Sequence, residues 1–143
     1  MSVPGVVQNN VAFHAHHSTD PFNVAAYGSI IYDAVTTNIG NAYDPQSGIF
    51  TAPHSGTYVF FVNCMARDNP DEELRLMTNG MSVASCYSGK ETSDDLYEQG
   101  ATTAIVHLVA GQRAMVTSIH SSARNIRGWE WNTFAGFLVH ADP

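Results

Sequence analysis

The sequence predicts an all-β fold, a two-sheet jelly-roll sandwich of about nine short strands. Three observations indicate this class. Val and Thr are abundant, leucine is scarce and Lys90 is the only lysine, which is a strand-favouring composition. No segment keeps a helical apolar period over three turns, whereas β-branched and aromatic runs recur between Gly, Pro, Asn, Asp and Ser clusters. Many antiparallel strands without helices need a closed two-layer arrangement, and a jelly roll provides one.

The expected strands follow the apolar runs in chain order. We expect strands near residues 11–17, 28–37, 48–51, 56–66, 73–77, 81–87, 101–109, 113–119 and 133–140. Turn-forming residues separate them at 44–48, 78–80 and 110–112. Asn79-Gly80 predicts a hairpin between two of these strands, because this pair suits a turn in which both central residues have positive φ.

The segment 56–64 is apolar on both sides of its expected strand. By the period of two, Tyr58 and Phe60 share one side, while Val59 and Phe61 occupy the other. The run 133–139 has the same character. A lone sandwich covers only one face of such strands, so the pattern favours an oligomer.

Length and charge narrow the function classes. The chain has 143 residues, enough for one domain with its own core. Its formal net charge is −7, which argues against a nucleic-acid partner. No apolar run is long enough for membrane insertion, and the first residues do not read as a secretion signal peptide. Cys64 and Cys86 allow one bridge, and the sequence does not separate this from two buried free thiols.

Motifs of catalysis are missing from the sequence. There is no Gly-x-Ser-x-Gly elbow, no His-Glu-x-x-His pair and no glycine-rich phosphate loop. We therefore expect a binding protein and not an enzyme.

A spaced set of residues resembles the pattern of the complement C1q globular-head domain, the jelly-roll module shared with the tumour necrosis factor superfamily. The set comprises Tyr32, Asn38, Tyr43, Phe50, Gly56, Tyr58, Phe60 and Val62. Segments 11–15, 38–45 and 134–139 are similar to the family's first strand, central turn and last strand. Tyr32 and Val62 depart from the family pattern, which usually has Phe and an aromatic residue there. The resemblance assigns residues 11–143 to the domain and residues 1–10 to an N-terminal extension.

The resemblance implies a ten-stranded jelly roll that assembles as a homotrimer, or as a higher oligomer such as a hexamer, with the first and last strands near the threefold interface. No Gly-X-Y stalk is present. The chain is thus similar to short, soluble invertebrate members, which are secreted lectin-like pattern-recognition proteins of innate immunity, some of them binding sialic acid.

The segment 120–131 is the first candidate for a ligand site. Arg124 or Arg127 would clamp a carboxylate, and Asn125 would bind hydroxyl groups. Further candidates in the segment are His120, Ser121, Trp129 and Trp131. A tryptophan face would stack on a sugar ring, so the set suits an acidic sugar such as sialic acid. The alternative is that both tryptophans, two apart on one strand face, belong to the core or the trimer interface.

Two segments are candidates for metal binding. Asp94, Asp95 and Glu98 lie in an acidic run that suits Ca²⁺, although such a run is also typical of a solvated turn. His14 and His16 share a strand face and suit Zn²⁺, but no third ligand is identifiable. We expect no required cofactor, with Ca²⁺ as an optional ion.

These observations lead to one prediction of function and one alternative. We predict an oligomeric carbohydrate-binding pattern-recognition lectin whose partners are acidic glycans or microbial surface ligands. The alternative is a trimeric signalling or structural ligand that binds a protein receptor.

Overall fold

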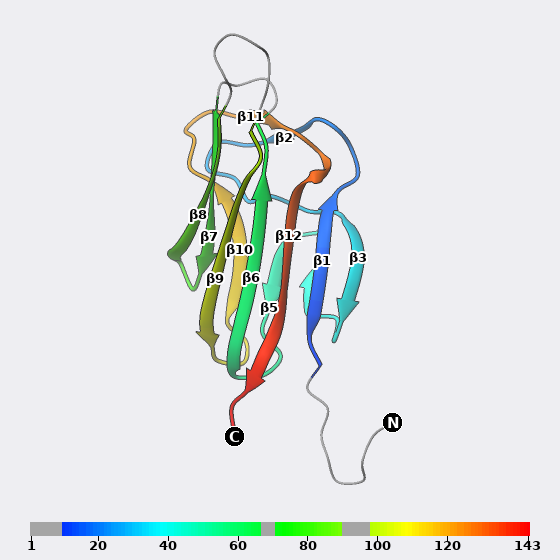
Figure 1. Cartoon of the computed structure of the whole chain (residues 1–143), viewed down its shortest axis with the longest axis vertical. Coiled ribbons are helices and arrows are strands. Elements are labelled where there is room, and N and C mark those ends of the chain that lie inside the picture. The colour runs from blue at the N-terminus through cyan, green and yellow to red at the C-terminus, as the bar shows by residue number, and fades with distance from the viewer. Residues whose placement is uncertain (1–9, 67–70, 90–97) are drawn as a thin grey trace.

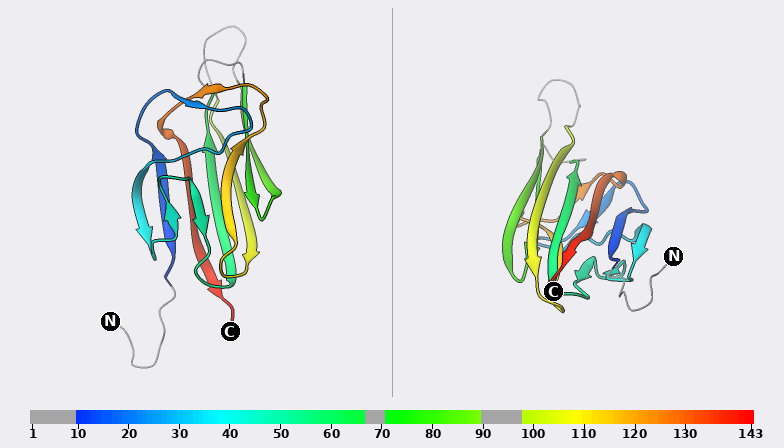
Figure 2. Two further views of the ribbon diagram at one scale, coloured as in Figure 1. Left: turned by 180° about the vertical axis from the view of Figure 1, so that it is seen from behind. Right: turned by 60° about the horizontal axis from the view of Figure 1, so that its bottom comes forward.

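Two five-stranded antiparallel sheets pack face to face in a computed structural model, which describes residues 10–66, 71–89 and 98–143 (Figure 1). The front sheet has the order β3 (Ala34–Ile39), β1 (Ala12–His17), β12 (Trp129–Ala141), β6 (Gly56–Cys64) and β9 (Gly100–Leu108). The back sheet has the order β4 (Tyr43–Asp44), β5 (Ile49–Thr51), β10 (Arg113–Ser118), β7 (Asp71–Thr78) and β8 (Met81–Gly89). β11 (Arg124–Ile126) pairs with β2 (Phe22–Val24) across one end of the sandwich (Figure 2).

The predicted all-β jelly roll is confirmed, with ten strands in the two main sheets. Among the described residues there is no helix, and hence none that is long and apolar enough to cross a membrane. The predicted strand at 28–37 is wrong in its first half, because β3 begins only at Ala34. Residues before it touch the back sheet through the isolated bridge between Ser29 and Thr117. The prediction also lacked β2, β4 and β11, which have only two or three residues each.

Aromatic rings fill the space between the sheets. Phe13 of β1 stacks on Tyr43 and Phe50 of the back sheet, with ring centroids 5.0 and 5.1 Å apart. Phe134 of β12 meets Phe13 edge-on at 4.8 Å. Tyr58 and Phe60, which the sequence placed on the inner side of β6, are fully buried. Offset and edge-to-face packing of this kind adds to the free energy gained from burying apolar surface.

The spaced residue pattern corresponds to specific contacts. The Asn38 side chain donates to the Tyr43 carbonyl at 2.8 Å and accepts from the Tyr43 backbone N–H at 3.3 Å. The Tyr43 hydroxyl then donates to the Tyr32 carbonyl at 2.7 Å. These bonds join β3 and β4 with the segment before β3. Gly56 starts β6 where a Cβ would collide with the His140 carbonyl of β12, so the position requires glycine.

The structure shows the outcome for the predicted hairpin and for the two cysteines. The hairpin at Asn79-Gly80 is confirmed: Thr78 pairs with Met81, and the two turn residues have φ values of 52° and 77°. Cys64 and Cys86, which the sequence left either free or bridged, form a disulfide. Since Cys64 lies on β6 and Cys86 on β8, the bridge joins the two sheets.

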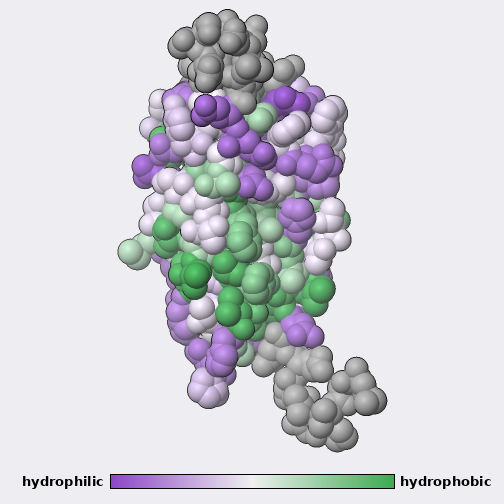
Figure 3. Space-filling model, in the orientation of Figure 1, coloured by the Kyte–Doolittle hydropathy of each residue, from purple (hydrophilic) through white to green (hydrophobic). Residues whose placement is uncertain are grey.

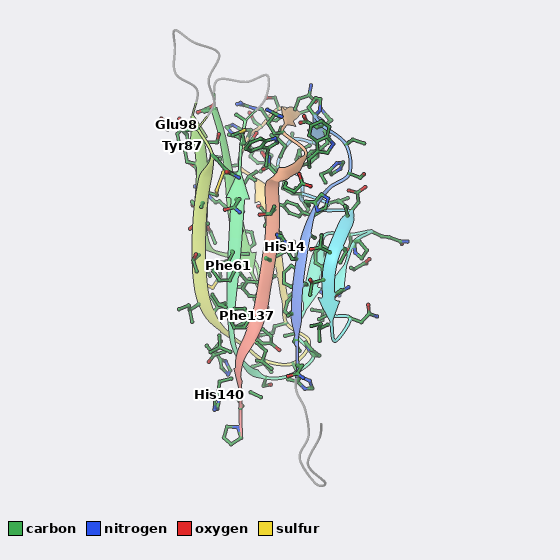
Figure 4. All side chains as sticks on the ribbon, turned by 45° about the vertical axis from the view of Figure 1, so that its right-hand side comes forward. His14, Phe61, Tyr87, Glu98, Phe137 and His140 are labelled. Carbon is green, nitrogen blue, oxygen red and sulfur yellow. A yellow bond between two sulfur atoms is a disulfide. The ribbon has the colours of Figure 1, made fainter. Side chains whose placement is uncertain are left out.

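The outer face of the front sheet is apolar across all five strands. One cross-strand row reads Ile39, Ala12, Phe137, Val59 and Ile105. In the neighbouring row Phe61 stacks on Phe137, with ring centroids 6.4 Å apart (Figure 4). Figure 3 shows this apolar surface in the lower part of the face, below a polar upper end. We call Ile39, Phe61, Ile105, Phe137 and Val139 the outer apolar face; their exposed fractions run from 41% to 72%.

Candidate ligand-binding surface

The predicted site segment 120–131 lies at the end of the sandwich that carries β11 and β2 (Figure 1). β11 holds Arg124 opposite Val24 and Asn125 opposite Asn23 in a short antiparallel pair. The Asn23 side-chain amide donates to the Asn125 side-chain oxygen at 3.2 Å. Ser121 is exposed in the connection that precedes β11. Because residues 124–126 form β11 and residues 129–131 begin β12, the segment is a structured cap on the sandwich.

Arg127 is held by a carboxylate that the sequence reasoning missed. Its Nε and Nη2 atoms donate to the two carboxylate oxygens of Asp20 at 2.9 and 3.1 Å. The backbone N–H of Gly128 donates to the same carboxylate at 2.8 Å. Asp20 lies 107 residues away in sequence, so no local motif relates it to Arg127. The bidentate contact expected for a ligand carboxylate is thus made within the protein.

Arg124 joins a buried polar cluster. Its guanidinium donates to the Asp71 carbonyl at 3.0 Å and to His120 Nδ1 at 2.8 Å. Nε2 of the same ring lies 3.3 Å from Glu72 Oε1 and accepts from the Glu73 backbone N–H at 3.2 Å. Arg124, His120 and Glu72 therefore form a chain of contacts from β11 to the start of β7.

Glu72 is a buried carboxyl at the start of β7. β7 begins at Asp71, and Glu72 then alternates inward with Leu74 and Leu76, so only 1% of its surface is exposed. This period of two was visible in the sequence. Burial raises the pKa of the Glu72 carboxyl to about 7, although Arg124 and the Ser118 hydroxyl act in the opposite direction.

The pKa of the His120 imidazole is shifted in the direction that keeps the ring neutral. Burial, followed by the Arg124 guanidinium, lowers the pKa of the His120 imidazole below its usual value. The Nδ1 lone pair that a proton would need already accepts from Arg124. At neutral pH the cluster thus combines a permanent cation, a neutral imidazole and a carboxyl near the middle of its titration.

Trp129 and Trp131 are exposed, with fractions of 49% and 41%. Neither tryptophan belongs to the core of the subunit, which removes one of the two alternatives for this pair. Trp129 has a φ of 50°, and the pairing of β1 with β12 changes register next to it, so strict alternation does not relate the two rings. The Arg127 guanidinium carbon lies 5.4 Å from the centre of the Trp131 ring, a cation–π arrangement. Asp20 therefore positions Arg127, and Arg127 positions Trp131.

The structure describes only some of the residues that the sequence suggested as metal ligands. Asp94 and Asp95 lie outside the described residues, while Glu98 is exposed beside the start of β9 (Figure 4). Within the described ranges, no three His, Cys, Asp or Glu side chains come together in a way that would hold a metal ion. His14 Nδ1 instead contacts the Thr36 hydroxyl at 3.2 Å. Calcium binding therefore stays a prediction, and the zinc prediction gains no third ligand from this part of the chain.

The chain folds as a jelly-roll sandwich. Polar and aromatic side chains gather at one end of the sandwich, and the outer apolar face lies on the front sheet. A family model for the C1q domain matches residues 12–139. The chain belongs to the C1q domain family.

Solved structures share the fold at low sequence identity. The globular domain of zebrafish complement 1qA protein superposes with a TM-score of 0.76 at 15% identity, covering 94% of this chain and 100% of that one. The Eiger TNF of S. frugiperda gives 0.78 at 13% identity, covering 95% and 96%. Murine APRIL gives 0.66 at 13% identity, covering 91% and 98%. At such identities the likeness establishes the architecture alone.

Proposed function

We propose that this chain is an extracellular, oligomeric carbohydrate-recognition protein that binds acidic glycans, including sialylated ones, at the end surface formed by residues 120–131. The observation that carries the proposal is the pair of exposed tryptophans on a structured cap. An aromatic ring fixed with an open side is what stacking on the apolar face of a sugar requires. Asn125 and Ser121 supply polar groups in the same cap, whereas His120 contacts Arg124 and Glu72 and supports the cap from within.

In this proposal the two arginines of the cap position other side chains and do not clamp the ligand carboxylate. Asp20 and Asp71 already contact Arg127 and Arg124, at 2.9 and 3.6 Å. We therefore assign both arginines to positioning the cap, with Arg127 setting the orientation of Trp131. An acidic sugar would still be favoured electrostatically next to these two guanidinium groups.

Oligomerisation is the second part of the proposal. The outer apolar face is a contiguous hydrophobic surface on one sheet, and such surfaces mark contacts between proteins. A homotrimer closed through this face covers it and leaves the end surface open. Several weak sites at fixed spacing then raise avidity without new contacts. The Cys64–Cys86 disulfide agrees with secretion, since disulfides persist in oxidising compartments.

A glycan array tests the proposal. We expect the wild-type protein to bind sialylated or uronic-acid probes, and Trp129→Ala and Trp131→Ala to lose at least tenfold in signal. Met81→Ala is the matched control, because Met81 is 70% exposed in the hairpin turn of the back sheet. An array without any signal, together with tight binding to a protein receptor, would contradict the proposal and support the trimeric signalling or structural ligand.

A further inference from the structure

We propose that the outer surface of β4, β5 and β10 holds a second saccharide site, in which Arg113 binds the carboxylate of an acidic sugar. This inference takes the class of ligand from the proposed function, but it places the recognition of the carboxylate at the other end of the sandwich. β10 runs from Arg113 to Ser118 towards the end that carries β11, so Arg113 lies far from the tryptophans (Figure 1).

Arg113 differs from the other described arginines because its guanidinium has no carboxylate partner that the structure describes. Among the described residues, Arg75 contacts Glu73 at 3.5 Å, Arg124 contacts Asp71 at 3.6 Å and Arg127 contacts Asp20 at 2.9 Å. The Arg113 side chain is exposed and has no hydrogen-bond or carboxylate partner within the same described ranges. Its planar set of N–H donors is therefore free for a ligand carboxylate, which matches such a group in two parallel bonds.

Arg113 lines a cavity of about 590 Å³ on the back sheet. This volume falls within the range of small-ligand sites, roughly 300–1,000 Å³. The polar side chains in its lining are Asn41, Asp44, Ser47, Thr51 and Arg113. The cavity joins a guanidinium, a carboxylate, hydroxyls and a carboxamide on one open surface, as recognition of a polyhydroxylated ligand requires.

Strand pairing fixes the floor of the cavity. Arg113 of β10 is the direct partner of Thr51 on β5, so both side chains stand on the same face of the sheet. The Thr51 N–H donates to the Ala42 carbonyl at 3.0 Å, which extends this row towards β4. The neighbouring inward pair, Ala114 and Phe50, is buried. The three strands thus hold Arg113 on rigid backbone with its side chain outward.

Two further polar groups of the cavity are also uncommitted. Within the described part of the chain, no hydrogen bond involves the side chain of Asn41 or Thr51. Asp44 differs, because its carboxylate accepts from the Gln46 N–H and the Ser47 hydroxyl, each at 2.9 Å. Asp44 is therefore committed to its own turn and does not form an ion pair with Arg113.

The charge of the cavity selects the class of ligand. Arg113 is the one cation that the described residues place in the lining, and it can balance one negative charge of a ligand that it contacts directly. The Asp44 carboxylate in the same lining and the net charge of −7 on the chain both oppose polyanions. A monosaccharide unit with one carboxylate fits both conditions. Its hydroxyls can bond to Thr51 and Asn41 while Arg113 takes the carboxylate.

Two matched glycosides test the site in solution. Methyl β-D-glucuronide and methyl β-D-glucoside differ only in a carboxylate against a hydroxymethyl group. We expect the ¹⁵N-labelled wild-type chain to bind the glucuronide saturably, with amide shifts at Ala42, Thr51 and Arg113, and to bind the glucoside at least tenfold more weakly. Arg113→Ala should lose at least tenfold in glucuronide affinity.

The controls separate this inference from the proposed function. Arg75→Ala removes the same charge from the same sheet and should bind the glucuronide as the wild type does. Arg113→Ala should unfold at the wild-type urea concentration, because its side chain has no described partner. Unchanged binding in Arg113→Ala, with binding lost in Trp131→Ala, would overturn the Arg113 site and leave the proposed function intact. If neither glycoside binds while the array does show acidic glycans bound through the tryptophans, the Arg113 site is likewise overturned.

Discussion

Glu72 shows how one buried side chain makes stability depend on pH. Its carboxyl is 1% exposed and has one oxygen, Oε2, without a described hydrogen-bond partner. Burial raises its pKa from 4.5 to about 7, so the folded state holds the proton more tightly than the unfolded chain. The stabilisation is present below about pH 4.5 and is lost as the pH rises towards 7. Its size is on the order of 3 kcal/mol.

Glu72→Gln removes this dependence while keeping the shape of the side chain. We expect the stability of the variant to increase relative to that of wild type as the pH rises from 4.5 to 8, because only the wild type loses the stabilisation from the protonated Glu72 carboxyl. His120 acts in the opposite sense: its lowered pKa costs stability as the pH falls below its usual value. That contribution is present in both proteins and largely cancels in the comparison. Parallel pH profiles in urea titrations would contradict the account of Glu72.

Arg127 offers a second test at the scale of one residue. The Asp20 side chain that it contacts is only 9% exposed, so Arg127→Ala leaves a nearly buried carboxylate without its main cation. Leaving a buried acceptor without its partner costs roughly 1–3 kcal/mol, and a charged acceptor falls at or above the upper end of this range. We expect a loss of that size in urea unfolding. Arg75→Ala is the control, because its ion pair with Glu73 is more exposed and should change stability by under about 0.5 kcal/mol.

The candidate site shows what sequence can predict about single residues. The segment 120–131 was found because it gathers two tryptophans and two arginines in a short stretch. Its partners Asp20 and Asp71 were not, since contacts over 107 and 53 residues leave no local pattern. Arg113 was overlooked for a related reason: its cavity exists only after β5 and β10 pair.

At the scale of strands, the Cys64–Cys86 disulfide is the one covalent cross-link between the two sheets among the described residues. It links β6 to β8 across 22 residues, and closing a loop of this length in the unfolded chain is worth about 3 kcal/mol. Replacing both Cys64 and Cys86 by Ala should lower the free energy of unfolding by about that amount. The matched comparison is wild type unfolded in urea with reductant. Equal midpoints for the variant and the oxidised wild type would contradict this role.

The strands also divide into those that sequence predicts and those that it does not. β6 and most of β12 were predicted, at 56–66 and 133–140, because apolar residues recur along both, whereas the first four residues of β12 were not predicted as strand. β2, β4 and β11 are too short to show alternation, and tertiary pairing defines them. The segment before β3 carries the buried residues Ile30 and Tyr32 but has only one isolated bridge, so apolar content alone misplaced a strand there.

For the whole molecule, the outer apolar face is the feature that a single subunit leaves unsatisfied. Phe61 of β6 lies in this face, and its ring stacks on that of Phe137 of β12. Phe61→Glu places a charge on the surface that a second copy would bury, so we expect the oligomer to dissociate into folded subunits. Val83→Glu is the control, since Val83 is 39% exposed on β8 of the back sheet and lies outside the proposed interface.

The mass of the wild-type chain in solution tests the central claim most directly. Size-exclusion chromatography with light scattering should give three times the subunit mass of 15.5 kDa, or a higher multiple of the trimer, and a single subunit mass for Phe61→Glu. A wild-type protein that remains at 15.5 kDa at high concentration would contradict assembly through the outer apolar face.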